Sequence, residues 1–261
     1  MATTVENKAM LTPGEIAVAA VGVGEYKTSK PNKTVFLSAM LAGMFIGLGY
    51  VGYLIVNGVM TDAGIAKVVG AAVFPVGLIL VLIAGADLFT GNTLISMALF
   101  NKKVALKDFV KNLSIVWLGN LFGALFLVTL IYVSSLFSQE VMDVTMQLAE
   151  KKAHLTFLEV CTRGIIANII VSLCVYMTYA AKDIVGKVVL AFFPIWLFVI
   201  SGAEHSIANM FVMPLGKLFG AEISWAEIAG NIIPATIGNV IGGLIISYAY
   251  YSLFIKDKKS A

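Results

Sequence analysis

Long apolar stretches separated by short polar segments dominate the pattern along the chain. Each is long enough to provide the about 20 residues that an α-helix needs to cross a bilayer. They cover residues 34–57, 65–100, 109–137, 157–181, 187–213 and 228–255. The second and fifth stretches carry the acids Asp87 and Glu204 near their middles, which predicts interrupted helices. The pattern therefore predicts an all-α membrane protein with six transmembrane helices.

The composition indicates that lipid is the solvent for much of the surface. Hydrophobic residues make up 59% of the chain and charged residues 13%, against about 45–50% and about 25% in soluble domains. The net charge of +3 is too small to predict a nucleic-acid partner. Cys161 and Cys174 would lie roughly 20 Å apart on one helix, too far for a disulfide. No metal-ligand spacing, cofactor motif, phosphate loop or nucleophile–base pair predicts an enzyme.

Lysine placement predicts the orientation of the chain. With the N-terminus inside, thirteen lysines fall in inside segments and four in outside segments, the bias of the positive-inside rule. The N-terminal residues lack the basic start and apolar core of a cleavable signal peptide. We expect a multi-pass protein of the plasma or inner membrane with both termini cytoplasmic. It divides into an N-terminal segment (1–33), a channel domain (34–256) and a tail (257–261).

A short apolar segment precedes the first predicted span. Residues 13–26 are rich in alanine and too short to cross the membrane. We interpret them as an amphipathic helix lying against the cytoplasmic face. A movable plug below a pore is the alternative.

The two halves of the chain resemble each other. Residues 85–92 (GADLFTGN) and 202–209 (GAEHSIAN) share an acid followed five positions later by asparagine. Residues 119–125 (GNLFGAL) and 238–244 (GNVIGGL) form a second match at nearly the same offset. Such self-similarity indicates an internal repeat.

The repeat predicts how the halves are arranged. Each half, about 34–137 and 157–256, holds three spans, and an odd number inverts the second half across the membrane. Interrupted helices at corresponding positions of inverted repeats point to a transport site near the midplane. Two half-helix N-termini meeting there would favour an anion. We expect Asp87 and Glu204 to cap those half-helices, and Asn120 and Asn239 to tie neighbouring helices together.

These residues resemble the formate/nitrite transporters. The matching pieces are 85–92, 119–125, 201–211 (SGAEHSIANMF) and 231–239 (NIIPATIGN). The resemblance covers nearly the whole chain, and SGAEHSIANMF is its most specific part. It implies an aquaporin-like fold, a homopentamer with one pore per protomer, and passage of small monovalent anions such as formate, nitrite or hydrosulfide.

The resemblance also implies roles for individual residues. His205 matches the central pore histidine, Thr90 the hydroxyl facing it, and Asn168 the amide that hydrogen-bonds it. Lys152 looks like the basic residue that draws anions into the outer vestibule. Arg163 departs from the family, which usually has an apolar residue at this position.

Four apolar residues match the family's constrictions. Leu78 and Phe198 correspond to the cytoplasmic constriction, and Leu88 and Phe74 to the outer one. In the resulting hypothesis, His205 compensates the anion's charge or donates a proton, so that passage depends on pH or is coupled to protons.

Two other functions are alternatives. A neutral-solute channel of the aquaporin type shares the two-half design, but no Asn-Pro-Ala motif occurs. A membrane subunit of an enzyme complex would need loops long enough to dock a soluble partner. The identity of the anion stays open among the three named.

Overall fold

The computed structural model describes residues 10–256. Nine residues of the predicted N-terminal segment and the predicted tail 257–261 lie outside the described part. Apart from one isolated bridge between Met10 and Ala181, its regular structure is helical. The elements are α1 (Pro13–Ser29), α2 (Asn32–Val59), α3 (Ala63–Val73), α4 (Val76–Ala84), α5 (Phe89–Asn92), η1 (Thr93–Ile95), α6 (Ser96–Phe100), α7 (Leu106–Ser134), α8 (Gln139–Ala153), α9 (Phe157–Thr178), α10 (Ile184–Ser201), α11 (Ser206–Phe219), α12 (Trp225–Tyr251) and η2 (Ser252–Lys256).

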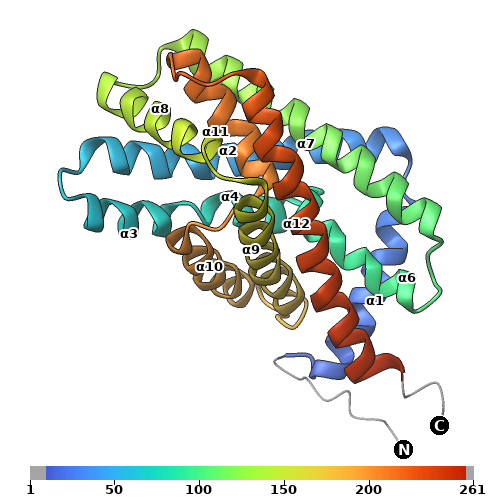
Figure 1. The fold of residues 1–261 in the computed structure, drawn as a ribbon. Helices are drawn as coiled ribbons and strands as arrows, with labels where there is room; N and C mark the ends of the chain where they lie inside the picture. The colour runs from blue at the N-terminus through green and yellow to red at the C-terminus, as the bar shows by residue number, and fades with distance from the viewer. Residues whose placement is uncertain (1–9, 257–261) are drawn as a thin grey trace, which may run out of the picture.

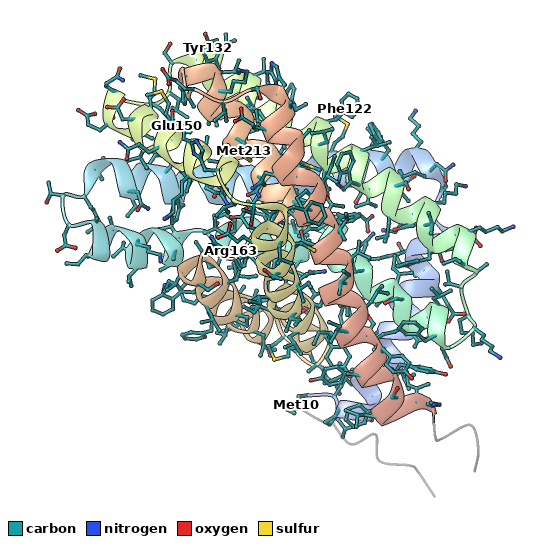
Figure 2. All side chains as sticks on the ribbon, viewed as in Figure 1. Met10, Phe122, Tyr132, Glu150, Arg163 and Met213 are labelled. Atoms are coloured by element: carbon teal, nitrogen blue, oxygen red, sulfur yellow. The ribbon has the colours of Figure 1, made fainter. Side chains whose placement is uncertain are left out.

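Six helical segments in the described range are long and apolar enough to cross a membrane, which confirms the predicted number of spans. They are Asn32–Val59, Ala63–Ala84, Leu106–Ser134, Phe157–Thr178, Ile184–Ser201 and Trp225–Lys256. Large apolar side chains cover the flanks of the bundle; Phe122 of α7, for example, is 55% exposed and points away from it (Figure 2). Such a flank is suited to lipid contact.

The second and fifth stretches are broken, as the sequence predicts. The helix α4 ends at Gly85 with φ +83°, and α10 ends at Gly202 with φ +69°. Glycine adopts this left-handed conformation without the cost that a Cβ imposes. The chain then runs extended through Leu88 and His205 before α5 and α11 begin.

Two asparagines satisfy the backbone groups that the breaks expose. Asn120 accepts a hydrogen bond from Phe89 N (2.9 Å) and donates to the carbonyl oxygen of Asp87 (3.0 Å). Asn239 accepts from Ser206 N (2.9 Å) and donates to the carbonyl oxygen of Glu204 (3.0 Å). The predicted capping by the two acids is therefore corrected: asparagine amides accept from the first N–H of each half-helix, and the carboxylates are held by lysines instead.

Close helix packing joins the elements of each half. α2 packs along α7, and α9 along α12 (Figure 1). A Cβ on Gly123 would strike the backbone of Met40, and one on Gly238 would strike the backbone of Cys161. These glycines thus allow two helix backbones to touch.

The halves also meet each other. The indole N–H of Trp117 in α7 donates to the hydroxyl of Thr236 in α12 at 3.1 Å. These positions differ by 119 residues, the same offset that relates Asn120 to Asn239. Equivalent positions of the two halves are therefore in contact, as expected on a pseudo-two-fold axis.

Each half begins with a short helix that does not cross the membrane. The predicted helix at 13–26 is α1, which packs against η1, α6 and α7 through a buried face. Its counterpart α8 was not predicted. α1 and α8 lie at opposite ends of the molecule (Figure 1). The structure thus extends the repeat by one helix in each half.

We predict that replacing either Asn120 or Asn239 by alanine lowers stability. Each change leaves an amide and carbonyls buried without partners, at about 1–3 kcal/mol per group. Thermal unfolding of the purified protein in detergent measures the effect. Ser114→Ala is the control, because this exposed hydroxyl on α7 bonds only within its own helix. Wild-type melting of both asparagine variants would contradict this account of the breaks.

Candidate functional site

A histidine and a threonine join the two breaks in the interior. His205 Nε2 lies 2.9 Å from Thr90 Oγ1, and the two residues are 4% and 0% exposed. The backbone N–H of Ala208 donates to His205 Nδ1 at 3.2 Å. Because a backbone N–H can only donate, Nδ1 is an acceptor, and the neutral ring carries its proton on Nε2 and donates to Thr90. The imidazole thus serves as the side-chain cap of α11 as well as the partner of Thr90.

Asn168 lies close to this pair but does not bond the imidazole. Its amide donates to Thr93 Oγ1 (3.0 Å) and to the carbonyl oxygen of Asn239 (2.5 Å). Thr93 in turn donates to the carbonyl oxygen of Thr90 at 2.6 Å. The direct bond to His205 that the resemblance implies is therefore replaced by an indirect connection through Thr93 and Thr90.

The acid of the second break is paired with the predicted vestibule lysine. Lys152 Nζ lies 2.8 Å from Glu204 Oε1, and both side chains are almost fully buried. Asn209, five residues after the acid, donates to the other carboxylate oxygen at 2.6 Å. This contact explains the acid-to-asparagine spacing of the repeat.

The acid of the first break has an equivalent arrangement that sequence reasoning missed. Asp87 pairs with Lys27 at 3.0 Å and Lys30 at 3.3 Å, and it accepts from Ser38 at 3.0 Å. Burial lowers the pKa of Lys27 from its usual value, and the Asp87 carboxylate opposes that shift. The lysines that precede each half, now seen in the last turns of α1 and α8, were the available signal.

Asparagines complete the same network on both sides. In the first half Asn92 donates to Asn112 (3.0 Å), which donates to the carbonyl oxygen of Lys27 (3.2 Å). In the second half the same chain runs through Asn209, Asn231 and the carbonyl oxygen of Lys152, at 2.7 and 3.0 Å. The two lysines therefore occupy equivalent positions at opposite mouths.

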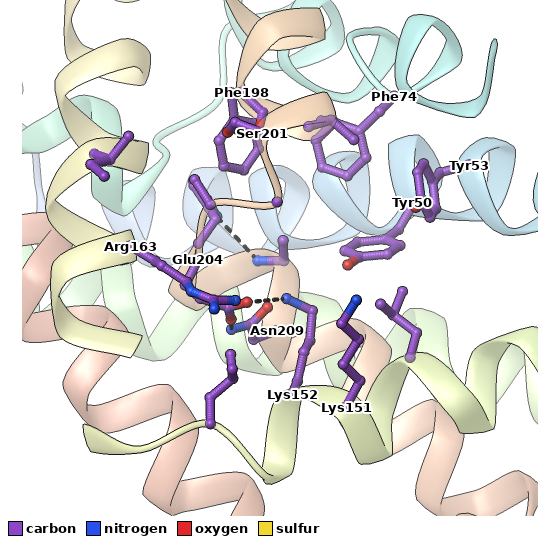
Figure 3. A pocket seen from close by; sticks show the side chains of 18 of the residues that line it. Tyr50, Tyr53, Phe74, Lys151, Lys152, Arg163, Phe198, Ser201, Glu204 and Asn209 are labelled. Atoms are coloured by element: carbon purple, nitrogen blue, oxygen red, sulfur yellow. Dashed lines mark hydrogen bonds and ion pairs between the residues drawn. The ribbon is translucent and has the colours of Figure 1, made fainter. Parts of the chain in front are cut away.

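A cavity of about 460 Å³ opens on the Lys152 side and reaches His205. Phe74 and Phe198 lie side by side on one wall, and Lys151 and Lys152 approach from the opposite one (Figure 3). The cavity therefore leads from basic groups past aromatic rings to the imidazole.

The predicted pairing of the constriction residues needs correction. The Phe74 and Phe198 rings lie 6.1 Å apart between centroids, and Phe198 also lies 5.7 Å from the His205 ring. Both therefore belong to the Lys152 side, because α10 packs across α3 and α4 where these two helices join. Leu88 follows Asp87, the acid held by the lysines of the opposite mouth. Leu88 and Leu78 are buried and do not line the Lys152 cavity.

Three further cations line the Lys152 cavity. Lys67 of α3 and Lys151 of α8 are exposed at its mouth, and Arg163 of α9 reaches into it. On the opposite face a polar hollow of about 380 Å³ is lined by Lys30 and Lys111, among others. Both mouths thus carry positive side chains. Among the described residues, no three His, Cys, Asp or Glu side chains gather as a metal site.

Six apolar helices, two helix breaks that meet, and a buried polar pair below a basic cavity define a membrane transport protein with a site between inverted halves. The sequence profile of the formate/nitrite transporters matches residues 14–253. The chain belongs to the formate/nitrite transporter family.

Individual relatives agree with this assignment. The chain is 39% identical over 254 residues to the uncharacterized transporter YrhG of Bacillus subtilis (strain 168), covering 95% of both chains. It is 36% identical over 276 residues to the formate channel FocA of Escherichia coli (strain K12), covering 95% of this chain and 96% of the relative. A pentameric formate channel solved with formate bound superimposes with a TM-score of 0.77 at 32% identity, covering 85% of this chain and 96% of that one.

We predict that Lys152→Met destabilises the protein by about 3–5 kcal/mol, the usual cost of leaving one member of a buried ion pair alone. Its exposed neighbour supplies the matched control, since Lys151→Met removes the same charge without a recorded ion pair among the described residues. Chemical unfolding in detergent measures both. Equal stability of the two variants would show that the Glu204 pair does not hold the second break.

Proposed function

We propose that this protein is a channel or transporter for small monovalent anions, namely formate, nitrite or hydrosulfide. The observation that carries the proposal is the buried contact between His205 and Thr90 at the floor of a cavity lined by cations. A relative 36% identical is a formate channel, and a similar solved structure holds formate. Both support an anion as the substrate.

The assembly and its setting follow the same reasoning. The similar solved channel is pentameric, and we infer a homopentamer with one pore in each protomer. The apolar flanks support lipid contact, and the lysine bias supports an inner-membrane protein. The described chain starts and ends at the same face, where α1 contacts η2. We assign this face to the cytoplasm and the Lys152 cavity to the outside.

Passage of the anion would take place in three steps. Cations at the mouth, including Lys152, raise the local anion concentration. The anion then enters the space beside Phe74 and Phe198, where loss of its hydration costs many kcal/mol unless a partner compensates it. Thr90 provides that partner through its hydroxyl, which accepts a hydrogen bond from the ring N–H of His205. A protonated His205 balances the charge or passes a proton to the anion, and the neutral weak acid crosses the apolar region beyond, near Leu88.

The geometry gives the hydroxyl a direct role in this proposal. Because Nε2–H donates to Thr90 Oγ1, the hydroxyl hydrogen of Thr90 is available to the anion. A hydroxyl that accepts one hydrogen bond becomes a better donor of another. Thr90 and His205 would then act as one unit on the substrate. Protonation of His205 at Nδ1 would break the bond to Ala208, so the protonated state involves a change at the start of α11.

We predict that His205→Phe slows formate entry into proteoliposomes by at least about tenfold, equivalent to about 1.4 kcal/mol of barrier. In the wild type, protein-dependent entry should rise as pH falls from about 8 to about 5, because protonation of the imidazole supplies compensating charge. The variant should lose that rise. Empty liposomes give the leak of undissociated formic acid, which is subtracted.

His154→Phe serves as the control for the histidine substitution. His154 is exposed at the end of α8, and its replacement leaves the buried pair intact. This variant should keep the wild-type rate and pH dependence. If His205→Phe kept the wild-type pH dependence as well, the proton-donor step would be incorrect. Water flux without any anion flux in the wild type would instead favour a neutral-solute channel.

A further inference from the structure

Arg163 lines the Lys152 cavity, and the internal repeat identifies the residue at the equivalent position of the first half. Asn120 donates to the carbonyl oxygen of Ala39, and its counterpart Asn239 donates to that of Gly164, at 2.8 and 2.9 Å. Ala39 and Gly164 are therefore equivalent, and so are the residues before them, Ser38 and Arg163. The two halves thus carry a short hydroxyl and a long guanidinium at the same place.

The structural role of this position does not need an arginine. In the first half, the Ser38 hydroxyl supports the break by donating to the Asp87 carboxylate. In the second half, the carbonyl oxygen of Arg163 accepts from Glu204 N at 3.4 Å, a contact that any residue could make. The Glu204 carboxylate already has Lys152 and Asn209 as partners. The guanidinium is therefore additional to the machinery of the break.

The guanidinium is also poorly satisfied within the chain. Among the described residues its one recorded partner is Glu159, with Arg163 Nη2 and Glu159 Oε1 3.8 Å apart, beyond hydrogen-bond range. The other oxygen of Glu159 is occupied by the cap of α9, where it accepts from Thr156 N at 2.9 Å. The Arg163 side chain is 39% exposed, and it extends from α9 into the cavity toward Glu204 and Lys152 (Figure 3).

Lys152 and Arg163 therefore differ in what they offer an incoming anion. The Lys152 ammonium is buried and held at 2.8 Å by Glu204. The Arg163 guanidinium offers five N–H donors in a planar fork, which matches an anion that presents two oxygens on one atom. An anion with a single binding atom can use only part of this fork.

We infer that Arg163 is a specificity-determining residue, which binds planar two-oxygen anions such as formate and nitrite bidentately in the Lys152 cavity before they reach His205. The inference rests on the proposed function, and it narrows the substrate class. It gives two-oxygen anions an advantage over hydrosulfide that the lysines, which act as point charges, do not provide.

Flux measurements with two substitutions separate the fork from the charge. Arg163→Lys keeps the charge and removes the fork, and Arg163→Leu removes both. In proteoliposomes, Arg163→Lys should raise the formate and nitrite concentrations for half-maximal flux about tenfold, with less than about a twofold change for hydrosulfide. Arg163→Leu should raise the concentration for half-maximal flux of all three anions. The maximal flux rates of both variants should stay near the wild-type rate. Equal shifts for all three anions with Arg163→Lys, or none, would overturn the inference.

A third variant and a binding measurement keep the test independent of folding and of flux. Glu159→Gln weakens the ion pair while its amide oxygen can still cap α9, and it should lower the half-saturating concentration of formate. Calorimetric titration of formate into the detergent-solubilised protein should show the same order: Glu159→Gln, wild type, Arg163→Lys. If the wild type carries no anion but this order holds, the proposed function fails and the inference stands. If binding does not depend on Arg163, the inference fails whatever the flux.

Discussion

The rest of this structure depends on hydrogen-bonding the backbone groups that the two helix breaks expose inside the bilayer. A helix interrupted at mid-membrane exposes N–H and C=O groups that lipid cannot satisfy, at several kcal/mol each. This chain interrupts two helices and satisfies both breaks in the same way, with Asn120 and Asn239 reaching from the neighbouring long helices. Because the asparagines do this, the acids beside the breaks remain available for lysines.

The same scaffold therefore carries different chemistry in its two halves. Leu88 and His205 occupy equivalent positions directly after the acids Asp87 and Glu204. The first half contributes an apolar side chain and the hydroxyl of Thr90, and the second contributes an imidazole. The contact between Thr90 and His205 across the breaks is a buried polar pair between two basic mouths. Equivalent residues hold the two breaks, whereas His205 and Arg163 differ in chemistry from their counterparts in the first half.

Much of the fold could be predicted from the sequence because lipid imposes simple rules. Apolar length gave the six spans, and the self-similarity around Asp87 and Glu204 gave the breaks and the inverted halves. The amphipathic helix α8 was not predicted, because it is polar and short and hydropathy therefore carries no signal for it. The capping of the half-helices was misassigned because carboxylates and asparagines are both good acceptors, and only three-dimensional packing shows that the acids face lysines.

The site was less accessible to sequence reasoning. The motif around His205 identified the imidazole, but the partner of Asp87, Lys27, lies in a helix outside the predicted spans. The grouping of Phe198 with Phe74 depends on how α10 crosses α3 and α4, which no pattern along the chain encodes. Likewise, the indirect position of Asn168 arises from Thr93, a residue that sequence reasoning had not singled out.

The central claim is that the two breaks place Thr90 and His205 in one functional unit on the anion path. A double-mutant cycle on formate entry into proteoliposomes, with Thr90→Val, His205→Phe and the double variant, tests it most directly. The account predicts that the double variant is no slower than the slower single variant, because either change disables the unit. Independent effects whose free energies add would contradict it.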